Sequence, residues 1–186
     1  AAFDTERVKE IERTTKHDVV AFLTNVAENV GPSSRFIHLG LTSSDVLDTA
    51  LALQLVAAAD VILEDLSRLR STLKRRAVEH QRTVLAGRTH GMHAEPMTFG
   101  LKLALWWDEM RRNRKRLSYA REVIAVGKIS GPVGTHATVP PSAEQRICAA
   151  LSLRVAPASN QIIQRDRHAE YLLSLALISA SISNVA

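Results

Sequence analysis

The sequence has little cysteine, proline, glycine or aromatic content: one cysteine, six prolines, eight glycines and 4% aromatic residues among 186. A single cysteine cannot form an internal disulfide, which is typical of a reducing compartment. Cys148 lies in QRICAALSL, an apolar helical pattern, and is expected to pack in a core. The N-terminal 18 residues lack the basic start, apolar core and cleavage site of a secretory signal. We therefore expect a cytoplasmic protein.

A membrane-spanning segment is not expected either. The apolar C-terminal stretch, residues 171–186, has 16 residues including four serines and an asparagine. It is shorter than the roughly 20 apolar residues that span a bilayer, so it predicts a buried bundle helix. This helix is still apolar at the last residue, with no glycine, proline or basic cluster to end it. We therefore expect that it continues and that the chain is part of a longer protein.

The charge balance raises the question of nucleic acid. The formal net charge is +5, and the densest basic run is RRNRKR at 111–116. This run has no interleaved aromatic residues and lies in a long helical pattern, so its side chains point all around the helix. We expect a solvated helix surface or a subunit contact, with nucleic-acid binding as the alternative.

The apolar spacing predicts an all-helical protein. Leucine, isoleucine and alanine recur every three or four residues through 46–80, and a second long helix is expected at about 97–126. Shorter helices are expected at about 141–153 and 165–186. A helix of about 35 residues would be about 50 Å long, too long for a compact globule, so the pattern favours a long-helix bundle or a coiled coil. No stretch alternates apolar and polar residues, and strands are not expected.

Three expected loops, 31–45, 86–96 and 127–141, are rich in glycine, proline, threonine and histidine. Five of the seven histidines lie in or beside these loops or next to arginines: His38, His90, His93, His136 and His168. Because connecting loops carry functional residues more often than scaffold helices do, candidate sites are expected there.

The first candidate is Thr42-Ser43-Ser44-Asp45, at the start of the first long helix. The first turn of a helix has unpaired N–H groups and the positive end of the dipole, so it attracts a carboxylate or phosphate. The same four residues are also typical of a capping-box-like helix start without any ligand.

The second candidate is GRTHGMHAEP at 87–96, in which two glycines accompany Arg88, His90 and His93. Glycine permits close approach to a ligand, and histidine exchanges protons near neutral pH. Metal binding by His90, His93 and Glu95 is an alternative, although this spacing matches no standard zinc pattern. The second alternative is that this loop has a purely structural role.

Two weaker candidates complete the set. Lys16-His17-Asp18 combines a cation, an imidazole and a carboxylate in a segment expected to be helical, where adjacent residues do not face each other. QIIQRDRHAE at 161–170 offers amides and guanidinium groups for an anionic ligand, or an ordinary helix start.

Taken in order, these four stretches resemble the fumarase/aspartase superfamily, and within it the adenylosuccinate lyases. TSSD before a long helix is a feature of the whole superfamily, whereas GMHAEP is the more discriminating part. KHDVVAF and QRDRHAEY add agreement, with Lys16 where the family often has arginine. The resemblance covers essentially the whole chain.

The resemblance implies a truncated long-helix bundle, with residues 1–41 ending an N-terminal helical domain, residues 42–186 beginning the central bundle, and the C-terminal part absent. It also implies β-elimination of fumarate from adenylosuccinate, giving AMP, and from succinyl aminoimidazole carboxamide ribotide in purine biosynthesis. It implies no metal or organic cofactor, no nucleic-acid or membrane partner, and a homotetramer with sites shared between subunits. The substrate is a small nucleotide that carries a phosphate and two carboxylates.

By the same resemblance, His90 is the general acid that protonates the leaving nitrogen. The implied substrate-binding residues are Lys16, His17, Asp18, Thr42, Ser43 and Gln161, with His17 orienting the phosphate or assisting the acid. His38, Arg88 and Thr89 are implied neighbours.

The family's glycine-rich loop, with paired serines followed by Met-Pro, Lys and Asn-Pro, does not occur in this sequence. That loop supplies the base in the family, so no residue of this chain receives that role, and the 186 residues alone are expected to be inactive. Another superfamily lyase, a carboxymuconate cycloisomerase, and a helical interaction or nucleic-acid-binding module are the competing interpretations.

Overall fold

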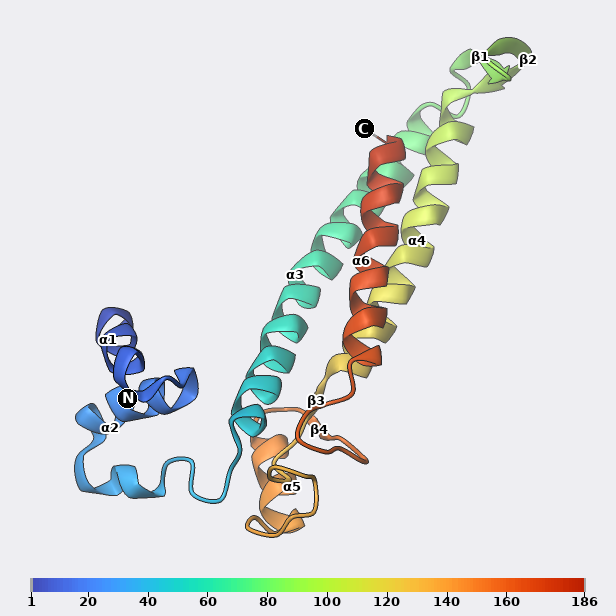
Figure 1. Cartoon of the computed structure of the whole chain (residues 1–186). Helices are drawn as coiled ribbons and strands as arrows, with labels where there is room; N and C mark the ends of the chain where they lie inside the picture. The colour runs from blue at the N-terminus through green and yellow to red at the C-terminus, as the bar shows by residue number, and fades with distance from the viewer. Residues whose placement is uncertain (1, 186) are drawn as a thin grey trace. The chain divides into compact units, whose positions relative to one another are not determined.

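The computed structural model describes residues 2–185 (Figure 1). In chain order its elements are α1 (Thr5–Thr15), α2 (Asp18–Val30), the 3₁₀ helix η1 (Gly31–Phe36), α3 (Ser43–Glu79), β1 (Val84–Thr89), β2 (Met92–Thr98), α4 (Phe99–Ile124), β3 (Val126–Gly127), α5 (Pro141–Ala150), β4 (Arg154–Val155) and α6 (Asp166–Val185). The predominantly helical fold and the long helices are therefore confirmed. α3 has 37 residues, about 55 Å at 1.5 Å per residue.

The described residues form two compact units, each built from two segments of the chain. Unit 1 comprises residues 2–50 and 126–163, and unit 2 comprises residues 51–125 and 164–185. The expected domain division after residue 41 stays a prediction.

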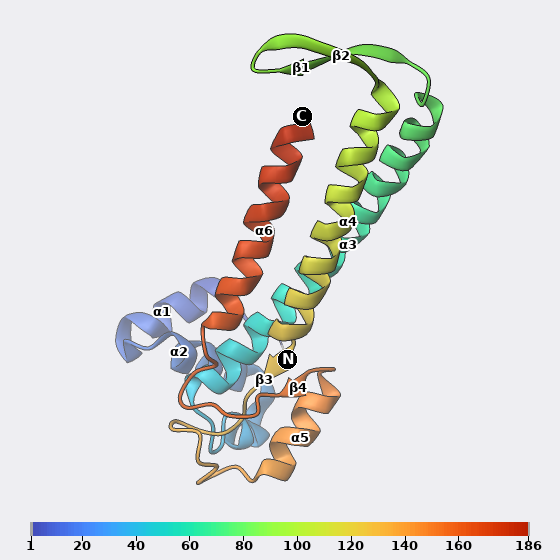
Figure 2. The ribbon, with the colours of Figure 1, turned by 90° about the vertical axis from the view of Figure 1, so that its right-hand side faces the viewer.

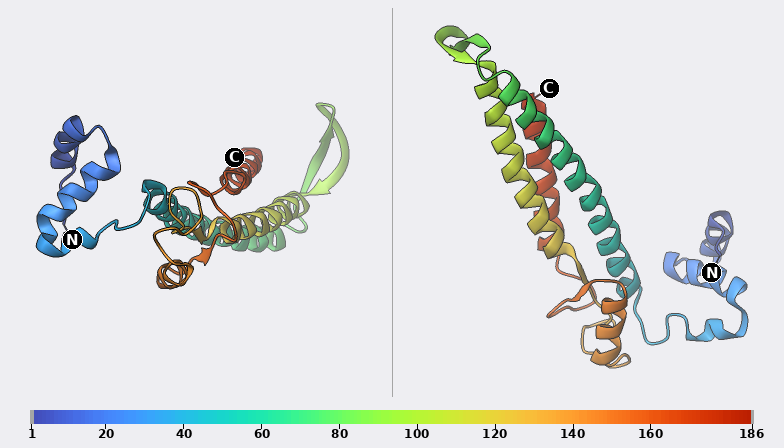
Figure 3. Two further views of the ribbon diagram at one scale, coloured as in Figure 1. Left: turned by 60° about the horizontal axis from the view of Figure 1, so that its bottom comes forward. Right: turned by 180° about the vertical axis from the view of Figure 1, so that it is seen from behind.

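Unit 2 is a bundle of three long helices: residues 51–79 of α3, together with α4 and α6, run side by side (Figures 1 and 3). Their apolar faces meet in one core, because leucines and isoleucines spaced by three, four or seven residues lie on one side of each helix. The buried core residues are Ala59, Leu66, Leu73, Leu103, Met110, Leu117, Ala120, Ile124, Tyr171 and Ile178.

Polar contacts fix the register of these helices. Buried Asn113 of α4 donates from Nδ2 to Ser181 Oγ of α6 at 2.8 Å, which is the way a buried amide avoids the cost of an unpaired polar group. Arg121 of α4 pairs with Asp60 of α3 at 2.5 Å. The basic residues of the 111–116 run are mostly exposed around Asn113, as expected of a solvated helix surface.

The expectation that strands are absent was wrong. Residues 84–98 form an antiparallel hairpin, β1 and β2, beyond the end of α3 and the start of α4 (Figure 2). His90 and Gly91 make its two-residue turn with φ of 54° and 73°, the left-handed pair that a type I′ turn requires. Such a turn fixes the strand pairing without alternation of apolar and polar residues. The apolar spacing of the sequence therefore did not predict the hairpin.

A register shift in the hairpin falls at Gly87. A Cβ at Gly87 would lie 2.5 Å from the Glu95 carbonyl oxygen, so the close approach of the two strands requires glycine there. The glycines of this segment therefore have a structural role in the hairpin.

Unit 1 contains the α1–α2 helix pair, the first residues of α3, α5 and the short parallel pair β3–β4. Gly127 of β3 permits close packing in this unit, since a Cβ there would lie 2.9 Å from Cys148 Sγ of α5. Cys148 is only 1% exposed, and burial raises the pKa of its thiol, so its expected packing role is confirmed.

α3 contains an 18-residue stretch that is apolar enough, by length and composition alone, to cross a membrane. Core helices of soluble bundles pass the same test; 22% of this stretch is buried, with Ala59 in the bundle core of unit 2 and Leu55 and Ile62 packed against it. We assign the apolar character of α3 to helix packing.

Candidate functional site

The start of α3 lies in a network of polar contacts in unit 1. Asp45 accepts the Thr42 N–H at Oδ2 over 2.9 Å, while the Asp45 N–H donates to the Thr42 carbonyl over 3.0 Å. This is the reaching-back half of a capping box, so the cap expected from the TSSD motif is present. The hydroxyl-bearing side chains of Thr42 and Ser43 stand at the first turn, beside the positive end of a 37-residue helix.

Lys16 and His17 do not lie inside a helix, contrary to the sequence expectation. Lys16 is the left-handed C-cap residue of α1, with φ of 54°, and His17 is the N-cap residue of α2. The break between the two helices removes the objection that adjacent helical residues face apart. It also brings His17 Nε2 to 3.4 Å from Ser43 Oγ, which joins two of the predicted site residues.

The His17 ring has two competing neighbours at Nδ1. The Val20 N–H donates to Nδ1 over 3.4 Å, and Asp18 Oδ1 lies 3.3 Å from the same atom. An N–H donor requires a lone pair at Nδ1, whereas a carboxylate favours a proton there, so the two contacts require different tautomers. In the tautomer that accepts from Val20 at Nδ1, the proton is on Nε2, the atom that lies 3.4 Å from Ser43 Oγ.

A loop after β3 surrounds the start of α3. Lys128 and Asp45 form an ion pair whose side chains are both 0% exposed. Lys128 Nζ also donates to the Gly131 carbonyl at 3.0 Å, and the Gly131 N–H donates to Asp45 Oδ2 at 3.2 Å. Farther along the loop, Thr138 Oγ1 donates to the Gly40 carbonyl at 2.5 Å. The sequence had indicated no role for Lys128 beyond its place in a loop.

Gln161 borders a hollow of about 380 Å³ in unit 1 that is lined by Pro132, Val133, Asn160, Gln161 and Ile162. Gly134 forms the bend beside it, with φ of 79°, and a Cβ there would lie 2.0 Å from the Ser159 carbonyl oxygen. Glycine is therefore required where the loop after β3 crosses the segment that carries Gln161. Gln161 itself is exposed.

His38 is half-buried and has a left-handed backbone, with φ of 67°. Its Nε2 atom is buried without a hydrogen-bond partner among the residues that the structure describes. An unpaired buried nitrogen is unfavourable, so this ring is a candidate to meet a group supplied by a ligand.

The remaining predicted residues, Arg88, Thr89 and His90, lie in unit 2 at the tip of the β1–β2 hairpin, and all three are exposed. Arg88 pairs with His93 across the strands, and Thr89 pairs with Met92. Cross-strand partners share a face, so Arg88 and His93 point to the same side of the hairpin. His90 sits in the turn itself.

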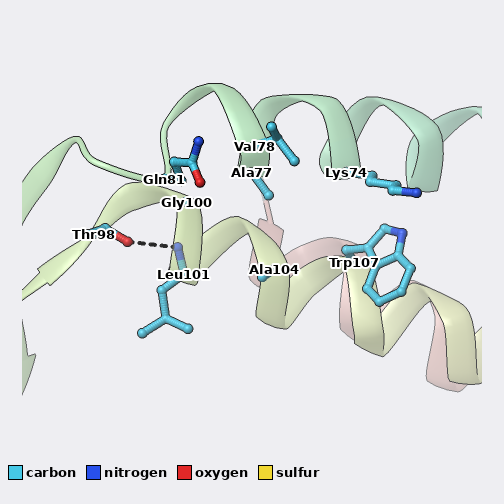
Figure 4. A pocket seen from close by; sticks show the side chains of 9 residues that line it. All are labelled: Lys74, Ala77, Val78, Gln81, Thr98, Gly100, Leu101, Ala104 and Trp107. Atoms are coloured by element: carbon cyan, nitrogen blue, oxygen red, sulfur yellow. Dashed lines mark hydrogen bonds between the residues drawn. The ribbon is translucent and has the colours of Figure 1, made fainter.

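A groove of unit 2, about 360 Å³ in volume, is lined by none of the predicted residues. It runs between the end of α3 and the start of α4 and is lined mainly by Ala77, Val78, Leu101, Ala104 and Trp107 (Figure 4). Lys74 lies beside Trp107 at one end. A mainly apolar lining of this kind is poorly suited to hold a nucleotide phosphate, and we do not assign it to the site.

The whole sequence, residues 1–186, matches the protein family described as Lyase. The chain therefore belongs to this lyase family. Among solved structures it resembles a fumarate lyase from a Mesorhizobium species, with a TM-score of 0.93 and 29% identity, covering 100% of this chain and 44% of that one. It also resembles a 3-carboxy-cis,cis-muconate lactonizing enzyme from Pseudomonas putida, with a TM-score of 0.87 and 33% identity, covering 98% and 43%.

Curated relatives are more similar in sequence. The chain is 58% identical to the adenylosuccinate lyase of Synechocystis and 54% identical to that of Bacillus subtilis, in each case over 100% of this chain and 43% of the relative. The adenylosuccinate lyase of Aquifex aeolicus is 52% identical over 97% of this chain and 41% of the relative. The chain thus spans less than half the length of these relatives.

Proposed function

We propose that the full-length protein containing this chain is an adenylosuccinate lyase. The observation that carries the proposal is the 49–58% identity, over 97–100% of the chain, to relatives with that name. The muconate-cyclising relative with the same fold is only 33% identical. Sequence similarity therefore favours a succinyl nucleotide over a carboxymuconate as the substrate.

The reaction we propose is an elimination. A base removes the proton beside a carboxylate of the succinyl group, the C–N bond breaks, and the electron pair of that bond goes to the departing nitrogen. A general acid protonates this nitrogen, which releases fumarate and AMP. The same chemistry on succinyl aminoimidazole carboxamide ribotide gives fumarate and the carboxamide. Such a reaction needs positioned proton donors and anion-binding groups, and we propose that it uses no cofactor.

We assign the general acid to His90. The tight turn at His90 and Gly91 supports this role, because a short hairpin presents the turn side chain away from its own strands. An exposed imidazole at such a tip is free to meet the leaving nitrogen once substrate is bound. Arg88 and Thr89 are adjacent on β1 and are proposed as neighbours of the substrate.

We assign substrate binding to Lys16, His17, Asp18, Thr42, Ser43 and Gln161. The contact of 3.4 Å between His17 and Ser43 supports the grouping of two of them. The first turn of α3 supplies N–H groups and dipole for a substrate carboxylate, and the Lys16 ammonium suits the phosphate. His38, whose buried Nε2 has no hydrogen-bond partner within residues 2–185, is proposed as a further neighbour.

The base lies outside these residues in our proposal, because the glycine-rich loop that carries it in the family has no match in this sequence. We further propose a cytoplasmic homotetramer in which sites are shared between subunits. The apolar side chains that the chain leaves exposed on α3 and α6, among them Leu47, Val61, Leu172, Leu173 and Leu177, support association. Light scattering that gave a monomer for the full-length protein would contradict the assembly.

The test of the proposed activity is cleavage of adenylosuccinate by the purified full-length protein, followed by absorbance and by fumarate release. We expect turnover with adenylosuccinate and none with carboxymuconate. A cycloisomerase would show the reverse, and another sister lyase would leave adenylosuccinate intact. RNA binding with a steep salt dependence, in a protein inactive toward all lyase substrates, would instead support a nucleic-acid-binding module.

A further inference from the structure

We propose that Asp45 and Lys128 are a positioning pair, in which the buried lysine neutralises the helix-start carboxylate so that the Thr42–Ser43 turn can accept an anionic group of the substrate. This inference rests on the proposed function. It concerns two residues that do not touch the substrate in our account and act through the turn.

The hydrogen bonds of Asp45 show how its side chain holds the turn. Its Oδ2 atom accepts N–H groups from Thr42 at 2.9 Å and from Gly131 at 3.2 Å, and its Oδ1 atom accepts from Lys128 Nζ. Both oxygens are therefore used, and the side chain is completely buried. The carboxylate fixes the backbone of Thr42 relative to the loop after β3.

Lys128 is held just as firmly. Thr49 lies four residues after Asp45, on the same face of α3. Its hydroxyl lies 3.2 Å from both the backbone N and the carbonyl O of Lys128. Lys128 Nζ donates to the Gly131 carbonyl as well as to Asp45. The lysine thus bridges one full turn of α3 to the loop and cannot swing out toward solvent.

The charge of this pair decides what the turn can bind. An uncompensated carboxylate in the first turn of α3 would repel a second carboxylate or a phosphate at Thr42 and Ser43, and the repulsion would be strong in a buried setting. Lys128 cancels that charge. The free N–H groups and the dipole of the helix start then remain available for the ligand.

The same loop holds the chain on the other side of the turn. Thr138 Oγ1 donates to the Gly40 carbonyl at 2.5 Å, and a Cβ at Gly40 would lie 3.1 Å from the Thr138 Cβ. The loop therefore holds the Thr42–Ser43 turn on both sides along the chain: through Gly40, which precedes the turn, and through Asp45, which follows it. Pro132 and Val133, in the same loop, border the Gln161 hollow, so the loop also connects two groups of predicted ligand-binding residues.

Each single variant leaves one unpaired charge of opposite sign. A positioning role predicts that KM depends on that sign, whereas a purely structural role predicts that it does not. In the full-length enzyme, Lys128→Met leaves a buried carboxylate beside the turn, and KM for adenylosuccinate should rise at least about tenfold. Asp45→Asn keeps an oxygen that can accept the Thr42 N–H but leaves a cation, so KM should not rise by more than about twofold. The double variant Asp45→Asn/Lys128→Met removes both charges and should restore KM to within about threefold of the wild type.

The matched control is Asp60→Asn/Arg121→Met, which removes an ion pair of unit 2 and should leave KM unchanged. Thermal unfolding of every variant shows which of them fold. If Lys128→Met does not fold, the comparison is made between Asp45→Asn and the double variant, with KM expected to be no higher in the former.

Equal increases of KM in both single variants, or no increase in Lys128→Met, would overturn the inference. A higher KM in Asp45→Asn than in the double variant would overturn it as well. All these comparisons require a wild-type enzyme that cleaves adenylosuccinate. A wild type without turnover would instead remove the proposed function, and this inference with it.

Discussion

The start of α3 and the tip of the β1–β2 hairpin both carry predicted site residues, but they differ in how those residues are held. At the start of α3, Asp45 and Lys128 are completely buried and hydrogen bonded. At the hairpin tip, Arg88, Thr89 and His90 are exposed on two short strands and their turn. One region is fixed by buried polar contacts, and the other by strand pairing and a tight turn.

This difference suits the two tasks of the proposed reaction. Groups that bind a carboxylate or a phosphate must already point at the ligand, because reorienting them during binding would cost affinity. A group that delivers a proton needs access to the leaving atom and a pKa near the working pH. The first task favours a buried network, and the second favours an exposed histidine on a short turn.

The largest effect should follow from removing the proton donor. His90→Ala in the full-length enzyme should lower kcat by about 10²–10⁴-fold, the usual value of general acid catalysis, while substrate binding is largely retained. Steady-state kinetics together with a binding measurement checks both halves. A kcat near that of the wild type would remove His90 from the mechanism.

A smaller effect is expected from His93→Ala. His93 lies in β2 opposite Arg88, so it is on the strand and not in the turn, and its ring is not assigned to proton transfer. We expect kcat to fall by less than about tenfold, well below the effect of losing a general acid. Equal losses of kcat in the His90 and His93 variants would leave the assignment between the two histidines without support.

The smallest effect should come from the scaffold of unit 2. The Arg121 side chain, through a hydrogen bond, lowers the pKa of Asp60 below its ordinary value. A carboxyl group whose pKa is lowered by folding contributes stability above its unfolded pKa and loses it as the pH falls through the folded pKa. The side chains of Arg121 and Asp60 are partly exposed, at 32% and 52%, so Asp60→Asn should cost less than about 1 kcal/mol at pH 7.

Urea unfolding of the wild type and of Asp60→Asn at several pH values measures this contribution. The difference in the free energy of unfolding should be greatest near neutral pH and should disappear in acid. A difference that grew as the pH fell would mean that the ionised pair destabilises the folded protein, contrary to the sign expected from the lowered pKa of Asp60.

The helices could be predicted from the sequence because their signal is local and periodic. Apolar residues at every third or fourth position located α3 to within three residues at its start, at Ser43 against an expected Val46. The TSSD motif also predicted the cap that Asp45 makes. Both features depend on residues close together in the chain, which is the information that spacing contains.

Long-range pairs could not be predicted in the same way. Lys128 meets Asp45 across 83 residues, and no feature of GKISGPVG indicates which carboxylate its lysine will contact. The hairpin was missed because its pairing depends on the His90–Gly91 turn, although an X-Gly pair between two short segments was a usable signal. Lys16 and His17 were assigned to a helix because a left-handed C-cap at a lysine has no clear sequence pattern.

The most direct measurement is the adenylosuccinate-cleaving activity of residues 1–186 expressed alone, compared with the full-length enzyme at equal concentration. Circular dichroism first establishes that the 186 residues are helical. Our account places the acid and several anion-binding groups in this chain and the base outside it, so it predicts no turnover by the 186 residues. It also predicts that adding the missing portion in trans restores activity if the two pieces reassemble. Turnover by the 186 residues alone would show that the base lies among them and would contradict the account.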